Sequence, residues 1–97
     1  MKYELEVIQW ADDRGLIDIG NEKTQLIKTY EELGEVSRAI IKNDRAALID
    51  GLGDVMVTLI IFARIKGLTL EDCLEEAYNV IKHRTGKTVN GAFIKNE

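Results

Sequence analysis

The stretch YEELGEV places Glu31, Glu32 and Glu35 within five positions. In a helix these carboxylates are neighbours at spacings of three and four residues, where like charges repel by roughly a few tenths of a kcal/mol per pair. A solvated surface arc is the ordinary explanation for such a pattern. Here the only cations nearby are Lys28 and Arg38, so the three negative charges are weakly compensated.

A second acidic pair, Asp50 and Asp54, lies in the segment IDGLGDVMVTLIIFARI. Four residues apart, the two aspartates project from one face of a helix. Beyond them the helix is apolar almost all round, which predicts a central element, and an unpaired charge at its margin is costly to bury. Gly51 and Gly53 each cost up to about 1 kcal/mol relative to alanine, which indicates close approach of another backbone or a ligand. The alternative, a preference for acids in a first helical turn, explains these aspartates poorly.

Together the two segments predict carboxylates that face one another from neighbouring helices. Such oxygen ligands suit Mg²⁺ or Mn²⁺ rather than zinc. A divalent ion would offset the repulsion that the acidic crowding creates. Magnesium sites built from few carboxylates are commonly completed by water and phosphate oxygens.

The elements that must position these residues read as helices throughout. Glycines end the periodic segments, and Thr69 with Asp72 resembles a capping box. We expect four helices, at about 3–14, 21–42, 44–66 and 70–84. The tail over 85–97 is expected to be a loop or a short extended segment. Short connections and the absence of proline predict an all-α, antiparallel four-helix bundle, formed by a single domain over 1–97.

Composition narrows the functional classes. The net charge is −4 and no long basic run is present, so the electrostatic signature of nucleic-acid binding is lacking. The lone cysteine, Cys73, cannot form an internal disulfide, which favours a reducing compartment. Cys73 lies with the apolar stripe of its helix, so we expect it to be an unreactive core residue. The N-terminal MKYELEVIQW lacks the apolar centre of a signal peptide. The longest apolar stretch, about nine residues, falls short of the roughly 20 that a membrane span needs. We expect a cytoplasmic protein without membrane contact.

The acidic segments resemble a known family. QLIKTYEELGEV, over 25–36, resembles the first signature of the MazG-like, all-α nucleoside triphosphate pyrophosphohydrolases, a Q-x-x-K-x-x-E-E-x-G-E run. The second signature is usually E-x-x-D followed by an apolar stretch. GDVMVTLIIFA supplies Asp54 and that stretch, but Gly51 stands where the glutamate would be, and Asp50 is the obvious substitute. The resemblance covers about 25–84.

This resemblance implies a Mg²⁺-dependent hydrolase that converts a nucleoside triphosphate to a monophosphate and pyrophosphate. By motif position Glu32, Glu35 and Asp54 would be metal ligands, with Asp50 replacing the missing glutamate. Glu31 is a ligand, a partner of a ligand, or the base that orients the attacking water. Metal ions neutralise phosphate charge and lower the pKa of bound water, and a carboxylate removes its proton.

Cationic residues would complete such a site. AYNVIKHR resembles the family's asparagine–lysine–arginine cluster for phosphate contact, formed here by Asn79, Lys82 and Arg84. Alternatively, the two cations simply complement a helix C-terminus. Lys28 is either an ion-pair partner of the glutamates or a phosphate contact. Trp10 packs in the core or a subunit contact, or else stacks on the base of a substrate.

Assembly follows from the third predicted helix, whose apolar side chains over 55–65 point in nearly every direction. A short chain has little material to cover them, so we expect a homo-oligomer, a dimer or a dimer of dimers. The resemblance implies the same. Two alternatives stay open. One is a non-catalytic helical module whose acidic face binds a basic partner or mimics the charge of DNA, and the other is a relative weakened in catalysis because Gly51 breaks the second motif. The preferred base and sugar are not identified.

Overall fold

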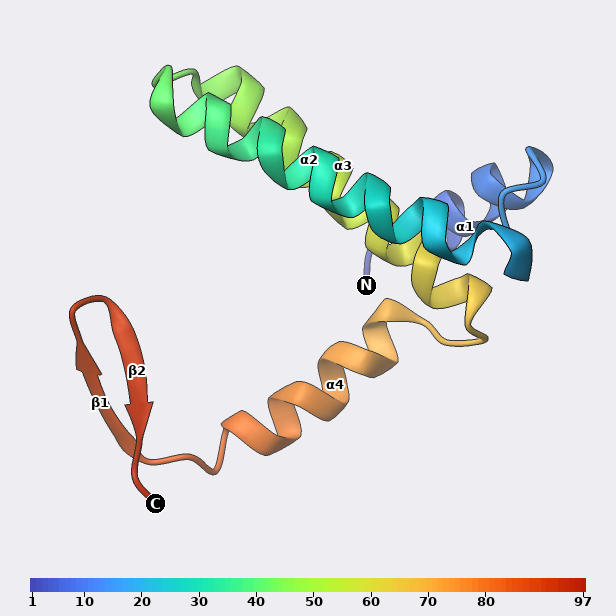
Figure 1. Ribbon diagram of the computed structural model, residues 1–97. Helices are drawn as coiled ribbons and strands as arrows, with labels where there is room; N and C mark the ends of the chain where they lie inside the picture. The colour runs from blue at the N-terminus through green and yellow to red at the C-terminus, as the bar shows by residue number, and fades with distance from the viewer.

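The computed structural model describes all 97 residues and consists of four α-helices and one β-hairpin (Figure 1). In chain order the elements are α1 (Glu4–Asp13), the 3₁₀ turn η1 (Ile19–Asn21), α2 (Glu22–Ile41), α3 (Arg45–Ile65), α4 (Leu70–Ile81), β1 (Gly86–Val89) and β2 (Ala92–Lys95). The expectation of a chain dominated by four helices is confirmed.

An antiparallel pair, α2 and α3, forms the centre of the molecule. The hydroxyls of Thr29 and Thr58 are hydrogen-bonded at 2.9 Å between the two helices. Two turns further along α2, Val36 packs against Gly51, where an added Cβ would lie only 3.1 Å from the valine Cγ2. The glycine therefore lets the two backbones approach closely, which is the first of the two explanations that the sequence offered for it.

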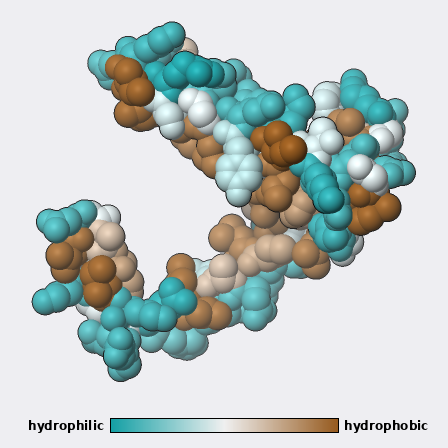
Figure 2. All heavy atoms as spheres, in the orientation of Figure 1, coloured by the Kyte–Doolittle hydropathy of each residue, from teal (hydrophilic) through white to brown (hydrophobic).

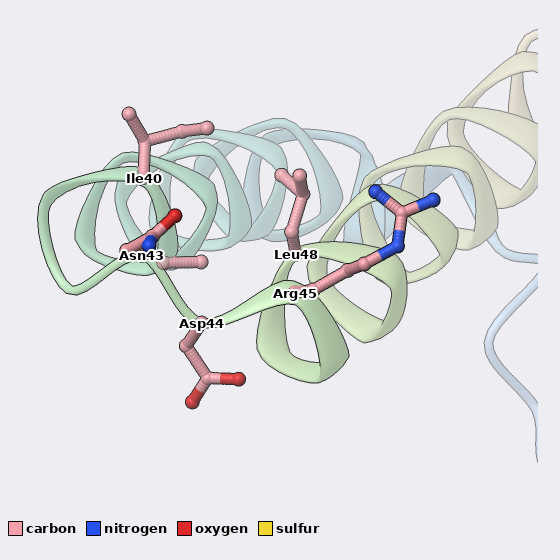
Figure 3. Close-up of a pocket in the computed structure, with 6 residues that line it drawn as sticks. Ile40, Asn43, Asp44, Arg45 and Leu48 are labelled. Carbon is pink, nitrogen blue, oxygen red and sulfur yellow. The ribbon is translucent and has the colours of Figure 1, made fainter.

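The turn that joins α2 to α3 is tight and capped. Asn43 adopts the left-handed conformation, with φ of 52°. The Asp44 carboxylate accepts a hydrogen bond from the Ala47 amide at 3.0 Å and so satisfies one free donor at the start of α3. A shallow cavity of about 270 Å³ lies beside this turn, with the Asp44 and Arg45 side chains pointing away from each other (Figure 3). None of the candidate site residues lines it.

Helix α1 packs against α3 and completes a small core. The buried apolar residues are Ala11, Ala39, Ile60, Ile61 and Ala63. Only 10 of the 97 residues are buried, so much of the apolar surface that the sequence encodes stays exposed in a single chain.

By length and composition alone, α3 could cross a membrane. The core helix of a soluble protein meets the same criteria, and 33% of its most apolar window is buried between neighbouring elements. The absence of membrane contact therefore stays a prediction.

Helix α4 leaves the body of the molecule instead of lying along α2 and α3 (Figure 1). It contacts α3 and, at its first two residues, Glu4 of α1, and every residue from Glu71 to the C-terminus is exposed. One chain therefore does not close the expected four-helix bundle. The prediction that Cys73 lies in a core is wrong, because the apolar stripe of α4 has no cover within this chain and the thiol is exposed.

The tail forms a two-stranded antiparallel hairpin. Its register pairs Gly86 with Lys95 and Val89 with Ala92. Asn90 and Gly91 connect the strands, both with positive φ, at 51° and 81°. Two such residues favour a tight hairpin turn, because its backbone twist matches that of the strands. We call residues 70–97, which comprise α4 and the hairpin, the arm.

Candidate active site

The contacts between α2 and α3 place two of the predicted carboxylates at the same level. Glu32 lies between Thr29 and Val36 along α2, and Asp54 lies between the partners of these residues, Thr58 and Gly51, on α3. Both carboxylate side chains are half-buried. The structure therefore brings the two signatures together at one part of the α2–α3 contact.

The remaining acidic candidates lie on the outer surface of the same pair. Glu31, Glu35 and Asp50 are exposed. Glu35 is paired with Arg38 one turn further along α2. The other four acidic candidates have no ion-pair partner in the chain: Glu31, Glu32, Asp50 and Asp54. Lys28 is exposed and forms no ion pair with any of the acidic candidates. The weak compensation that the sequence indicates thus persists in three dimensions.

The carboxylates are not gathered into a compact cluster. No group of three or more His, Cys, Asp or Glu side chains lies close enough to hold a metal ion. The donor set nevertheless suits a hard cation, because the polar side chains at the α2–α3 contact offer oxygen atoms and neither helix contains histidine or cysteine.

An open cavity of about 470 Å³ borders the acidic residues between α1 and α3. Asp54 and Trp10 both line it, together with Tyr3, Glu6, Val7 and Val57. The Trp10 side chain is partly exposed, and the guanidinium of Arg14 stacks on the indole ring with 4.3 Å from its carbon to the ring centroid. Trp10 is thus not a core residue in this chain. It forms an apolar wall next to a candidate metal ligand.

The predicted phosphate contacts lie apart from the carboxylates of their own chain. Asn79, Lys82 and Arg84 are all exposed on the arm, and none forms an ion pair or hydrogen bond with an acidic candidate. Arg84 instead borders a cavity with Ile81 and Phe93. Within one chain the structure therefore brings together the acidic motifs and Trp10, but not the cations.

Sequence reasoning missed several residues around this site. Tyr3 and Val7 line the cavity with Trp10, and their spacing of three and four residues was the available signal. Gln25, the first residue of the first signature, is buried and its amide oxygen has no hydrogen-bond partner. Glu4 is also buried and holds the start of α4, a long-range contact that no local pattern predicts.

Comparison with known proteins gives one matching protein family and one similar protein. The sequence model of the MazG nucleotide pyrophosphohydrolase domain matches residues 20–89. An uncharacterized 18.2 kDa protein from the rep-hol intergenic region of Haemophilus phage HP1 (strain HP1c1) is 38% identical over 56 residues, which cover 58% of this chain and 34% of the relative. The aligned part thus spans about a third of that protein's length. No solved structure matches the chain.

Proposed function

Because the chain belongs to the MazG nucleotide pyrophosphohydrolase family, we propose that it is a Mg²⁺-dependent hydrolase that cleaves a nucleoside triphosphate to a monophosphate and pyrophosphate. One observation carries the proposal. Glu32 and Asp54 lie at the same level of the α2–α3 contact, and Asp54 also borders the cavity that Trp10 lines. Carboxylates for a phosphate-bound cation and an aromatic wall for a base thus lie side by side.

In this proposal Glu32, Glu35, Asp50 and Asp54 would hold the metal, with Mn²⁺ as the substitute for Mg²⁺. When bound, the ion would neutralise phosphate charge and lower the pKa of water. Glu35 would give up its ion pair with Arg38 to serve as a ligand. Asp50, which is exposed, would replace the glutamate that the motif has at the position of Gly51.

The chain's other residues bind the substrate and move one proton. Water attacks the α-phosphorus, the bond from that phosphorus to the oxygen that bridges it to the β-phosphate breaks, and pyrophosphate leaves. Glu31, exposed and free of ion pairs, accepts the proton of the attacking water. Trp10 stacks on the base, and Lys28 contacts phosphate from the glutamate side of α2. Asn79, Lys82 and Arg84 supply the further phosphate contacts.

The biological setting that we propose is the removal of unwanted nucleotides from the cytoplasmic pool. A homo-oligomer is part of the proposal, since a single chain leaves the phosphate-binding cations away from the carboxylates. The rival function is a non-catalytic acidic module.

The test is pyrophosphate release from a panel of ribo- and deoxyribonucleoside triphosphates with Mg²⁺, Mn²⁺ or EDTA. We expect turnover that needs the divalent ion and that Asp54→Asn abolishes. Asp12→Asn is the matched control, because Asp12 is exposed on α1 and does not line the cavity that Asp54 borders. A folded wild-type protein that releases no pyrophosphate and binds no metal would favour the acidic module.

A further inference from the structure

Exposed apolar side chains are common on this chain, and Figure 2 shows them on several parts of its surface. The exposure of Trp10 alone therefore does not identify a binding site. What distinguishes Trp10 is its place in the wall of the open cavity of about 470 Å³ between α1 and α3. This volume lies within the range of about 300–1,000 Å³ that is usual for small-molecule sites.

One side of α1 forms most of the cavity wall. Tyr3, Glu6, Val7 and Trp10 all line the cavity, and their spacings of three and four residues place them on the same side of the helix. The position of Trp10 is fixed by Arg14, whose guanidinium stacks on the indole ring and donates a hydrogen bond to the Trp10 carbonyl oxygen at 2.9 Å. Because Arg14 does not line the cavity, the part of the indole that borders the cavity stays open.

The cavity offers few polar side chains, and its charged ones are both carboxylates, those of Glu6 and Asp54. No lysine, arginine, histidine, asparagine or glutamine lines it. Glu6 is exposed and forms no ion pair within the chain. Since Asp54 is assigned to the metal, Glu6 is the carboxylate that is free to recognise another part of the substrate.

A free carboxylate distinguishes between nucleobases. Its two oxygens only accept hydrogen bonds, and they match two adjacent N–H donors, as in the paired bonds between arginine and a carboxylate. Guanine presents such a pair, at N1 and at the amino group on C2. On adenine and cytosine the amino group adjoins a ring nitrogen that accepts hydrogen bonds, and on uracil and thymine the ring N–H lies between two carbonyl oxygens. A carboxylate that faces those bases therefore meets an acceptor and is repelled.

We propose that Glu6 recognises the edge of the base and that the preferred substrate is a guanine nucleotide. The base lies on the open part of Trp10, and Glu6, one turn earlier on α1, accepts hydrogen bonds from the N1–H and the C2 amino group. The phosphates extend toward Asp54, which lines the cavity from α3. This inference rests on the proposed function for the reaction and adds the identity of the base. Because Glu6 is exposed to water, we expect the lower end of the contribution of a charged hydrogen bond, a preference of about tenfold.

The first test compares kcat/KM for GTP, ITP, ATP, CTP and UTP in the presence of Mg²⁺. We expect the value for GTP to exceed those for ATP, CTP and UTP by about tenfold. ITP keeps the N1–H but lacks the C2 amino group, so its value should lie between. A wild-type protein that does not prefer GTP among these triphosphates would overturn the proposal.

The variant Glu6→Gln separates base recognition from a general role in the site. Glutamine offers one acceptor and one donor, and each of the five bases has a donor beside an acceptor on this edge. The variant should therefore lower kcat/KM for GTP and raise it for ATP, CTP and UTP. Asp12→Asn, exposed on α1 and outside the cavity wall, is the matched control and should keep the wild-type preference. An equal loss with all five triphosphates would show that Glu6 acts on the metal or the fold and not on the base.

A second test does not depend on turnover. Trp10 is the only tryptophan of the chain, so its fluorescence reports binding in the cavity during titration with GMP, AMP, CMP and UMP. We expect GMP to bind about ten times more tightly than the other three, and Glu6→Gln to remove the difference. If the wild-type protein releases no pyrophosphate but retains the preference for GMP, the proposed function fails and the guanine site stands. Equal affinities for the four monophosphates, or no saturable change with any of them, would overturn the guanine site whatever the activity.

Discussion

One carboxylate oxygen of Glu4, in the first turn of α1, lies 2.6 Å from the amide nitrogen of Leu70, the first residue of α4. The other oxygen accepts from the Glu71 amide at 3.1 Å. Glu4 is only 4% exposed, so a buried negative charge satisfies two free donors at the positive end of α4. The N-terminal amino group adds an ion pair with Glu71 at 2.6 Å. The start of the chain thus sets the direction of the arm.

We predict that Glu4→Ala destabilises the protein by about 1–3 kcal/mol, the usual cost of leaving buried donors unsatisfied. Urea denaturation measures the change, and amide hydrogen exchange at Leu70 and Glu71 should accelerate with it. Asp12→Ala, an exposed acid on the same helix, is the control and should stay within about 0.5 kcal/mol of wild type. Equal stabilities for the two variants would contradict the anchoring role.

The two glycines of the second acidic segment should respond to alanine in opposite ways. A Cβ at Gly53 meets nothing within 4 Å, so Gly53→Ala should stabilise α3 by about 0.5–1 kcal/mol through helix propensity. A Cβ at Gly51 would lie 3.1 Å from Val36 Cγ2. Gly51→Ala should therefore lose that gain or become destabilising by about 1–3 kcal/mol as α2 and α3 are forced apart. Thermal unfolding of both variants checks the contrast. A larger gain from Gly51→Ala than from Gly53→Ala would show that the helices can separate freely.

The metal should leave a signature in stability as well as in turnover. Because Glu32 and Asp54 lie at the same level of the α2–α3 contact and neither has an ion-pair partner, Mg²⁺ bound between them should raise the melting temperature. A ligand at 100 times its dissociation constant adds about 2.7 kcal/mol. Asp54→Asn should lose most of this gain while keeping its helicity, and Asp12→Asn should retain it. The result that would sink the assignment is an Asp54→Asn variant that Mg²⁺ stabilises as strongly as the wild-type protein.

Much of the secondary structure could be predicted from local sequence patterns. Helical spacing of apolar residues, interrupted by glycines, predicts four helices. Asp44 and Thr69 cap the starts of α3 and α4, as their residue types indicate. For the tail the sequence predicts a loop or a short extended segment, whereas the structure has a hairpin there, and the Asn90–Gly91 pair is a strong signal for its two-residue turn. Few alternating apolar positions flank that pair, which is why the strands were less evident than the helices.

Long-range relationships were harder to read. The pairing of the two acidic segments followed from their signatures, and the structure places Glu32 and Asp54 at the same level. The direction of α4 did not follow, because it depends on Glu4, some 66 residues away along the chain. The sequence also did not show which apolar side chains of α3 are buried within one chain. Ile60 and Ile61 are buried, whereas Leu52 and Met56 are exposed.

The last prediction concerns pH and the pair formed by Glu22, the first residue of α2, and Lys66, which follows α3. Their side chains meet at 2.6 Å. The hydrogen bond from Lys66, reinforced by its charge, lowers the pKa of Glu22 below the ordinary value of 4.5. The unfolded chain thus takes up this proton at a higher pH than the folded one does, and the contribution to stability is present above about pH 4.5 and is lost as the pH falls through the folded pKa.

Lys66→Met should therefore lower the melting temperature slightly at pH 7, and this difference from wild type should shrink as the pH falls below 4.5. The effect is small because the pair is at the surface, and 1 M NaCl should reduce it further by screening. Lys87→Met is the matched control, since Lys87 is exposed on β1, forms no ion pair and does not act on Glu22. Melting curves from pH 3 to pH 7 measure the difference. A Lys66→Met deficit that stays constant down to pH 3 would mean that Lys66 stabilises the helix ends by packing its aliphatic stem and not by its charge.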